Sequence, residues 1–301
     1  MADKKILILS NNAIMLVPSL EKSLREAGSN LKFSFKTDYT FEEADLIFID
    51  YSLFKMHDSK YADVLNYREK LAFLTALIDH IQVNEILRET HVSHLIGLSG
   101  PNSFSDIRDF IITFFTGVNW TTETIMKSPK FKTEKLIKSS ESLASDIKDL
   151  LAGHDFSIWF DGLQDYLNLI LNESIINALY NAPTDEQGNH ISRHLNRKQP
   201  TYSLPGKEPL VTVTTDNKKV VISVKDFYGS LRPKEIFDFL PSGEVKEKEG
   251  GAGVGMYLIF KYVHKYIINI DTGKSTENIF VIEGDKRFKW YLSKEKSFHI
   301  F

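Results

Sequence analysis

Three uninterrupted apolar runs in the first third of the chain place the strongest constraint on its fold. They are "KILILS" at 5–10, "ADLIFID" at 44–50 and "HLIGLS" at 94–99. Runs without polar alternation are typical of strands buried on both faces, as in a parallel sheet between helical layers. A shorter run, "LKFSFK" at 31–36, and helical patterns at 13–27, at about 67–88 and at about 105–116 complete the series. Residues 1–132 are therefore predicted to form an α/β domain with a parallel sheet.

The remainder of the chain has a different pattern. Residues 133–152 carry apolar side chains at helical spacing and predict an amphipathic connector helix. A long helical pattern at about 161–181 precedes a polar loop at 183–205 and a hairpin, "PLVTVTTDNKKVVISVKD", at 209–226. Further strands are predicted at "YIINID" (266–271), "NIFVIE" (278–283) and "KWYLSK" (289–294). Residues 153–301 are thus predicted to form a two-layer α/β sandwich with a mainly antiparallel sheet.

Composition limits the classes of function. The chain contains no cysteine, which excludes disulfides, thiolate zinc sites and cysteine nucleophiles. Its net charge is −3 and its lysines are scattered, so no nucleic-acid partner is expected. No apolar stretch reaches the roughly 18 residues that cross a bilayer, and the first residues lack a signal-peptide cleavage pattern. We expect a cytoplasmic protein without direct membrane contact.

A polar stripe interrupts the apolar helix pattern in "NESIINALYNAP" at 172–183. Glu173, Asn177 and Asn181 are four residues apart and share one helix face. The Asn177 carbonyl oxygen can bind a hard cation, and the Glu173 carboxylate can accept a proton. The alternative is that these residues belong to a solvated outer face.

Two further motifs follow in order. "VKDFYGSL" places Asp226 at the end of a predicted strand and Gly229 three residues later. A carboxylate there can accept the exocyclic amine of adenine, and a glycine lets a flat ring approach the backbone. "GGAGVG" at 250–255 opens a helix, where free backbone N–H groups can bind phosphates. Taken singly, these motifs are also compatible with a turn aspartate and a flexible loop.

The order of the three motifs resembles the N, G1 and G2 boxes of the GHKL superfamily, whose ATP-binding domain has the Bergerat fold. The resemblance covers about residues 153–301 and implies ATP and Mg²⁺ as cofactors. It implies that Asn177 is the magnesium ligand, that Asp226 reads adenine and that Gly229 admits the ring. Asn181 would lie at the helix end, on the nucleotide side. The resemblance further implies a mobile lid at "SGEVKEKE" (242–249) and phosphate contacts from Gly251, Gly253 and Gly255.

Glu173 indicates which chemistry the resemblance implies. In the gyrase-type and anti-sigma-factor kinase branches, this position holds a glutamate that acts as the base, whereas many histidine kinases have asparagine. The resemblance therefore implies hydrolysis or Ser/Thr phosphorylation of a partner, closest in kind to the anti-sigma-factor serine kinases. The alternatives are an ATP-gated binding module without catalysis and a histidine-kinase relic, for which His154 is a poor acceptor.

The sequence departs from the GHKL pattern at two places. Arg193, Arg197 and Lys198 in the long 183–205 loop are expected to lie in water rather than to contact phosphate. The threonine that often opens the family's late strand is expected to be replaced near Asn278.

In the first domain, Asp50, Ser99 and Lys127 are predicted to lie at the carboxyl ends of successive parallel strands, where α/β sheets bind ligands. The set resembles a response-regulator receiver domain, which has a flavodoxin-like fold. Asp50 would be the phospho-acceptor, Ser99 the switch hydroxyl and Lys127 the phosphate partner. Receivers hold magnesium with an acidic pair after the first strand, but Ser10 and two asparagines follow it here. We therefore expect a degenerate receiver that serves as a docking or dimerising module, with phosphorylation of Asp50 as the alternative.

The expected partner is a regulatory protein such as a sigma factor or an anti-anti-sigma-like protein, and a homodimer is a further candidate assembly.

Overall fold

The computed structural model describes residues 4–10, 32–34, 41–56, 61–76, 79–98, 103–197, 199–239 and 259–301. The chain is α/β and divides into two compact units. Unit 1 contains Met1–Asn119 and Lys294–His299, and unit 2 contains Trp120–Ser293 and Ile300–Phe301. The helix predicted at 13–27, the lid at 242–249 and the glycines at 250–255 lie outside the described residues.

Unit 1 contains a parallel sheet, as its apolar runs predict. Its strands run in the order β2-β1-β3-β4-β5, the order of flavodoxin-like sheets. The side chains of β3, β4 and β5 are buried throughout. This burial explains why the apolar runs that form β3 and β5 show no polar alternation. The strands are β1 (Lys5–Leu9), β2 (Lys32–Ser34), β3 (Leu46–Asp50), β4 (Leu71–Thr75) and β5 (His94–Gly97).

The single helix predicted at about 67–88 is wrong. A 3-10 segment, η2 (Ala62–Lys70), leads into β4, and only α4 (His80–Thr90) is an α-helix. The side chain of Asp79 caps this helix by accepting a hydrogen bond from the Ile81 N–H group at 2.9 Å. The strand "LAFLT" was missed because a short apolar run beside a helical pattern cannot be assigned by periodicity alone.

A sixth strand of unit 1 comes from the far end of the sequence. β11 (Ser297–Ile300) pairs antiparallel with β5, so that Phe298 faces Leu95 and His299 faces His94. This makes the unit 1 sheet mixed. The strand predicted at 289–294 is wrong, because helix α11 (Phe288–Leu292) occupies most of that range and the strand begins only at Ser297. On unit 1, α5 (Ser103–Thr116) places the Phe110 ring 5.4 Å from that of His299.

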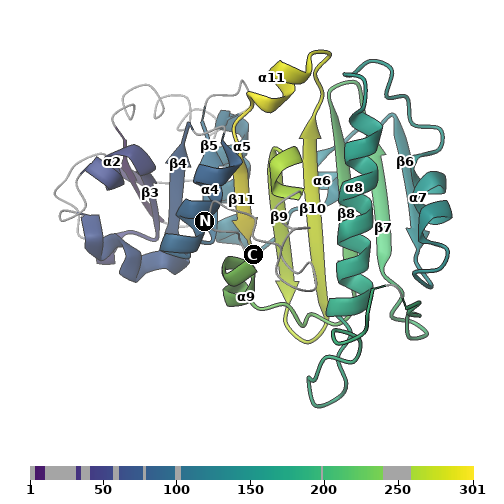
Figure 1. Ribbon diagram of the computed structural model, residues 1–301. Coiled ribbons are helices and arrows are strands. Elements are labelled where there is room, and N and C mark those ends of the chain that lie inside the picture. The colour runs from purple at the N-terminus through teal and green to yellow at the C-terminus, as the bar shows by residue number, and fades with distance from the viewer. Residues whose placement is uncertain are drawn as a thin grey trace. The chain divides into compact units, whose positions relative to one another are not determined.

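Unit 2 is built on an antiparallel sheet with the order β9-β10-β8-β7-β6. Helices α7 (Leu143–Leu151) and α8 (Leu163–Ile176) pack on one face of it (Figure 1). Apolar side chains from α8, such as Leu167 and Ile170, are fully buried with those of β7 and β8, such as Val213 and Ile222. The strands are β6 (Phe131–Leu136), β7 (Leu210–Thr215), β8 (Lys219–Asp226), β9 (Lys265–Asp271) and β10 (Ser275–Glu283).

The predicted connector helix at 133–152 is partly wrong. Its first residues belong to the edge strand β6, and only Leu143–Leu151 is helical. Lys135 lies on the helix-covered face of β6 and pairs with Asp146 at 2.8 Å and with Asp149 at 2.6 Å. Strand and helix therefore belong to the same layered unit, and the described residues contain no free-standing connector here.

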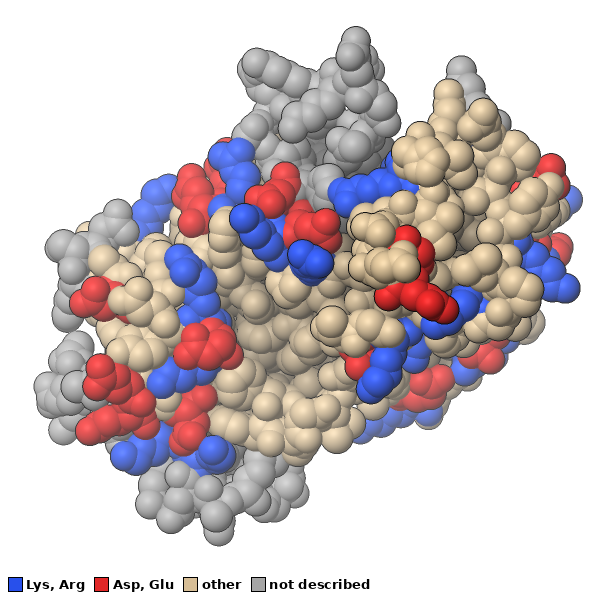
Figure 2. Space-filling model, turned by 90° about the horizontal axis from the view of Figure 1, so that it is seen from below, with Lys and Arg blue, Asp and Glu red and all other residues tan. Residues whose placement is uncertain are grey.

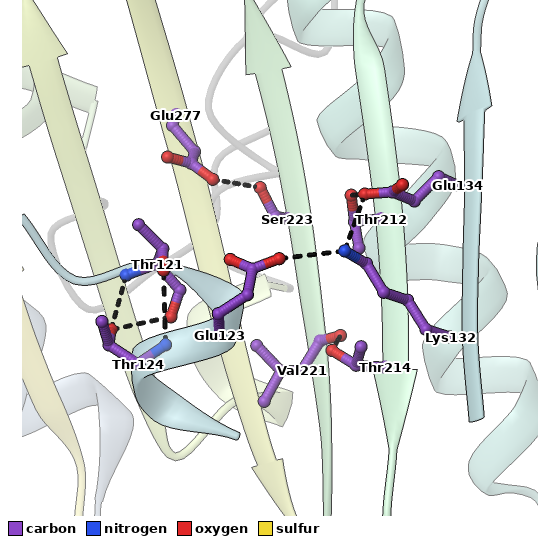
Figure 3. A network of polar contacts seen from close by, with 10 residues as sticks. All are labelled: Thr121, Glu123, Thr124, Lys132, Glu134, Thr212, Thr214, Val221, Ser223 and Glu277. Carbon is purple, nitrogen blue, oxygen red and sulfur yellow. Dashed lines mark hydrogen bonds and ion pairs between the residues drawn. The ribbon is translucent and has the colours of Figure 1, made fainter. Parts of the chain in front are cut away.

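The opposite face of this sheet carries the short helix α6 (Thr122–Ile125) and a polar network (Figure 3). Lys132 on β6 donates to Glu123 on α6 at 2.9 Å, and Ser223 on β8 donates to Glu277 on β10 at 2.6 Å. The hydrogen bond from Lys132 lowers the pKa of Glu123 to about 2. Ser223 precedes Val224, which faces α8, so strand alternation places this network away from the helical layer. None of the helices in the described part of the chain combines the length and apolar character needed to cross a bilayer.

Candidate functional site

A cavity of about 620 Å³ lies within unit 2 between α8 and the sheet. Helix α8 continues past Ile176 into a π-type turn, η3 (Asn177–Asn181). The polar stripe Glu173, Asn177 and Asn181 lines this cavity, rather than lying on an outer face of the helix. Asp226, predicted to end a strand, is the last residue of β8 and lines the same cavity.

Two of the stripe residues are bonded to each other. Asn181 Nδ2 donates to Asn177 Oδ1 at 3.0 Å, which orients the Asn177 carboxamide with its oxygen as the acceptor. A carbonyl oxygen has a second lone pair, so this bond leaves Asn177 Oδ1 able to bind a cation. Asn181, which had no firm role in the sequence, therefore fixes the orientation of the Asn177 side chain.

Asp226 is only 4% exposed, and backbone N–H groups hold its carboxylate. Its Oδ1 accepts from Tyr228 N at 2.9 Å and from Gly229 N at 3.2 Å. Burial raises the pKa of Asp226, and these hydrogen bonds oppose that increase. The residue thus forms a side-chain turn at the strand end and also presents a buried carboxyl group to the cavity.

Thr276 is a site residue that sequence reasoning missed. It lies near the start of β10, directly opposite Asp226, and lines the cavity. Its side chain is 1% exposed, and Oγ1 has no partner with hydrogen-bond geometry among the described residues, although it lies near enough to help hold the Asp226 charge. A threonine thus stands near the start of this strand, two residues before Asn278. Asn278 instead accepts a hydrogen bond from the Tyr266 hydroxyl at 2.8 Å.

Gly229 has a structural reason for being glycine that differs from the predicted one. Its φ is +60°, and a Cβ atom there would lie 2.2 Å from the carbonyl oxygen of Asp271. The Gly229 carbonyl accepts a hydrogen bond from Gly273 N at 3.0 Å. Close packing against the β9–β10 turn therefore requires glycine here, whether or not a ring approaches the backbone.

The 183–205 loop also lines the cavity, and its Arg193 and Arg197 are solvent-exposed, as expected, while each also contacts a carboxylate. Arg197 Nη1 lies 3.7 Å from Glu173 Oε2, and Arg193 Nη1 lies 3.5 Å from Glu235 Oε1 on α9 (Pro233–Phe239). Lys198 lies outside the described residues. The cavity wall therefore combines carboxylates, carboxamides and two guanidinium groups.

In unit 1, Asp50 ends β3 as predicted and is 7% exposed. Ser10, just after β1, donates to Asp50 Oδ2 at 2.7 Å. Lys127 follows helix α6 in unit 2, so its predicted place at the end of a parallel strand is wrong. Ser99 lies outside the described residues. Thr75 ends β4, the strand beside β3, and is buried.

Comparison with protein-family models finds no matching family, and comparison with curated proteins finds no similar sequence. Within the described residues, no cluster of three or more His, Asp or Glu side chains could hold a metal ion. A cation at Asn177 would therefore take most of its ligands from a bound anion and water. On the face drawn in Figure 2, basic and acidic side chains are intermixed, without an extended region of one sign.

Proposed function

We propose that unit 2 is a GHKL-type domain that binds ATP with Mg²⁺ and transfers a phosphoryl group to a serine or threonine of a partner protein. The observation that carries this proposal is the pairing of Asp226 with Thr276. A buried carboxylate and a buried hydroxyl stand side by side in a cavity whose opposite wall holds Glu173 and Asn177.

The adenine end of the cavity would be formed by Asp226 and Thr276. A carboxylate can accept the exocyclic amine, and Thr276 Oγ1 can donate to a ring nitrogen or accept from a bridging water. Apart from its proximity to Asp226, the Thr276 hydroxyl has no partner with hydrogen-bond geometry among the described residues, so a nucleotide could complete its hydrogen bonding. The volume of about 620 Å³ lies within the range of roughly 300–1,000 Å³ typical of small-molecule sites.

The phosphate end would be formed by the C-terminal part of the polar stripe. Asn177 would contribute its oxygen to Mg²⁺, and Asn181 would keep that oxygen aimed by the bond described above. Mg²⁺ would supply positive charge that neutralises the phosphates. The proposed phosphate contacts of Gly251, Gly253 and Gly255 lie outside the described residues.

Glu173 would be the base for the transfer. The hydroxyl of the protein substrate would give its proton to Glu173 as its oxygen forms a bond to the γ-phosphorus. The bond from that phosphorus to the β,γ-bridging oxygen breaks, and ADP leaves with the electron pair. The Glu173 side chain is 18% exposed and belongs to the cavity wall, which supports its proposed position beside a nucleotide in that cavity.

One alternative is an ATP-gated binding module without catalysis. The contact of Glu173 with Arg197 favours it, because a guanidinium already engages the carboxylate that would act as the base. The histidine-kinase relic is disfavoured. His154 is 8% exposed, and its two ring nitrogens lie 2.7 Å from the Thr133 hydroxyl and 2.8 Å from the Thr215 hydroxyl, so neither is available as a phosphoryl acceptor.

For unit 1 we propose a regulatory role as a receiver-like docking or dimerising module in a cytoplasmic signalling protein. Its strand order and the position of Asp50 support the likeness to receivers. Ser10 in place of an acidic residue gives a magnesium ion little charge to bind, so Asp50 phosphorylation is the less favoured role. The proposed partner is a sigma factor or an anti-anti-sigma-like protein.

Calorimetric titration with ATP, with and without Mg²⁺, tests nucleotide binding directly. We expect binding that requires Mg²⁺ and that Asn177→Ala abolishes. Phosphoprotein detection in a lysate incubated with labelled ATP then separates the two candidate functions. If the protein is a kinase, Glu173→Ala should abolish phosphorylation of the partner. If it is an ATP-gated binder, the wild type should phosphorylate no protein, and Glu173→Ala should retain its affinity for ATP. Absence of any ATP binding by the wild-type protein would reject both.

A further inference from the structure

We propose that Arg197 couples phosphate binding to the release of Glu173. This inference rests on the proposed function and concerns the regulation of the same site. Arg197 has two alternative anionic partners, the Glu173 carboxylate and the terminal phosphates of ATP, and a bidentate pair with phosphate would turn the guanidinium away from its long contact with Glu173. The arrival of phosphate therefore frees the carboxylate for proton transfer.

The backbone that carries Arg197 is held in place beside α8. Tyr180, 2% exposed in η3, donates its hydroxyl to the Gln199 carbonyl at 2.5 Å and lies 3.4 Å from the Arg197 carbonyl. Ser140 Oγ lies 3.2 Å from the same hydroxyl and accepts from Thr201 N at 3.0 Å. This limb of the loop is therefore anchored where the polar stripe ends, and the Arg197 side chain reaches the cavity from a fixed point.

The ion pair with Glu173 has the properties of an exchangeable contact. The Arg197 Nη1 to Glu173 Oε2 distance is 3.7 Å, and 35% of the arginine side chain is exposed. A long contact of this kind lacks the two parallel hydrogen bonds of a strong guanidinium–carboxylate pair. A phosphate group offers that fork geometry and more negative charge, so it competes well for the same guanidinium.

Arg193 provides a built-in comparison. It lines the same cavity from the same loop, but its carboxylate partner is Glu235 on α9. Both arginines contribute positive charge to the cavity, yet only Arg197 contacts the proposed base. Loss of Arg193 should therefore alter affinity for ATP without altering the coupling to Glu173.

A double-mutant cycle tests the proposal. Affinities for ATP and for adenosine are measured by calorimetry in the wild type, Arg197→Ala, Glu173→Gln and the double variant, with folding checked by thermal melting. We expect Arg197→Ala to weaken ATP binding about ten- to hundredfold, the loss typical of a charged hydrogen bond, and to leave adenosine binding unchanged. Glu173→Gln should tighten ATP binding, because it frees the guanidinium, and should have no effect once Arg197 is absent.

The controls separate this proposal from general electrostatics. In the Arg193→Ala background, Glu173→Gln should still tighten ATP binding, and Arg197→Lys should recover part of the affinity. If the wild type binds ATP but Arg197→Ala binds it equally well, the coupling proposal is overturned while the proposed function stands. The same conclusion follows if the Glu173→Gln effect persists without Arg197. A wild type that binds neither ligand overturns both.

Discussion

Thr276 lies directly opposite Asp226 in the antiparallel ladder between β10 and β8. Directly opposed residues point to the same face of a sheet, so the hydroxyl and the carboxylate share one cavity wall. The two residues are 50 positions apart in sequence, and only strand pairing brings them together. Substitutions of Asp226 and Thr276 therefore test the same wall of the cavity.

Asp226→Asn should weaken ATP binding by about a hundredfold, because the amide cannot supply the same two acceptor oxygens to adenine and to Tyr228 N and Gly229 N. Asp216→Asn is the matched control. Asp216 precedes the other end of β8, and its Oδ1 also accepts two backbone N–H groups, from Lys218 and Lys219. Calorimetry should show ATP affinity unchanged in this control. Equal losses in the two variants would argue against an adenine-reading role for Asp226.

Thr276→Val should change the melting temperature little, because the buried hydroxyl has no partner with hydrogen-bond geometry among the described residues and contributes only through its proximity to the Asp226 charge. The same change should weaken ATP binding about tenfold if that hydroxyl contacts the nucleotide. Thr214→Val provides the opposite case, since Thr214 Oγ1 donates to the Val221 carbonyl on the other face of the sheet. It should lower the melting temperature without a change in affinity. A Thr276 variant that melts lower and binds ATP normally would contradict the assignment.

Gly229→Ala should destabilise unit 2 in the presence or absence of nucleotide, because the new Cβ would meet the Asp271 carbonyl oxygen at 2.2 Å. Gly273→Ala isolates the cost of backbone conformation. Its φ is +75° and no atom lies within 4 Å of the added Cβ, so a cost of about 1–2 kcal/mol is expected. Denaturant unfolding measures both. If the Gly229 variant is as stable as the Gly273 variant, the β9–β10 turn must move to accommodate the added Cβ, and the predicted steric cost is wrong.

Lys296 should make the stability of unit 1 depend on pH. Burial lowers its pKa to about 7 in the folded chain, from 10.5. Between these values the unfolded state binds more protons, so the free energy of unfolding should rise with pH by at most about 1.4 kcal/mol per unit. Lys296→Met should remove this slope and increase stability near neutral pH.

Hydrogen exchange of the β5 amides from pH 7 to 10, corrected for the intrinsic pH dependence of exchange, measures the effect of Lys296. Lys289→Met on the exposed side of α11 is the control, and its slope should match that of the wild type. If the slope survives in Lys296→Met, another group is responsible for it.

Local sequence pattern was sufficient for part of the fold. The strands β1, β3 and β5 are continuous apolar runs, and β7 and β8 form a hairpin with a recognisable turn. Each of these strands can be recognised from the pattern of a few consecutive residues. The polar stripe on α8 and the strand-end Asp226 were likewise visible, because helical spacing and a strand terminus are local properties.

The missed elements depend on partners far away in sequence. β4 is five residues long and is stabilised as a strand by β3 and β5 on either side, which override the helical pattern around it. β11 pairs with β5 across a separation of 200 residues, marked by the bond from Gly97 N to Ser297 Oγ. Thr276 and Arg197 joined the site only through tertiary structure, and no spacing rule links them to Glu173 or Asp226.

The position of β11 has a consequence for synthesis of the chain. The other strands of the unit 1 sheet are translated before residue 98, but the strand that pairs with β5 is made only after all of unit 2 except its last two residues. During translation, β5 therefore presents an open edge while nearly 200 further residues emerge. Unit 1 therefore cannot complete its sheet until these late residues have been made.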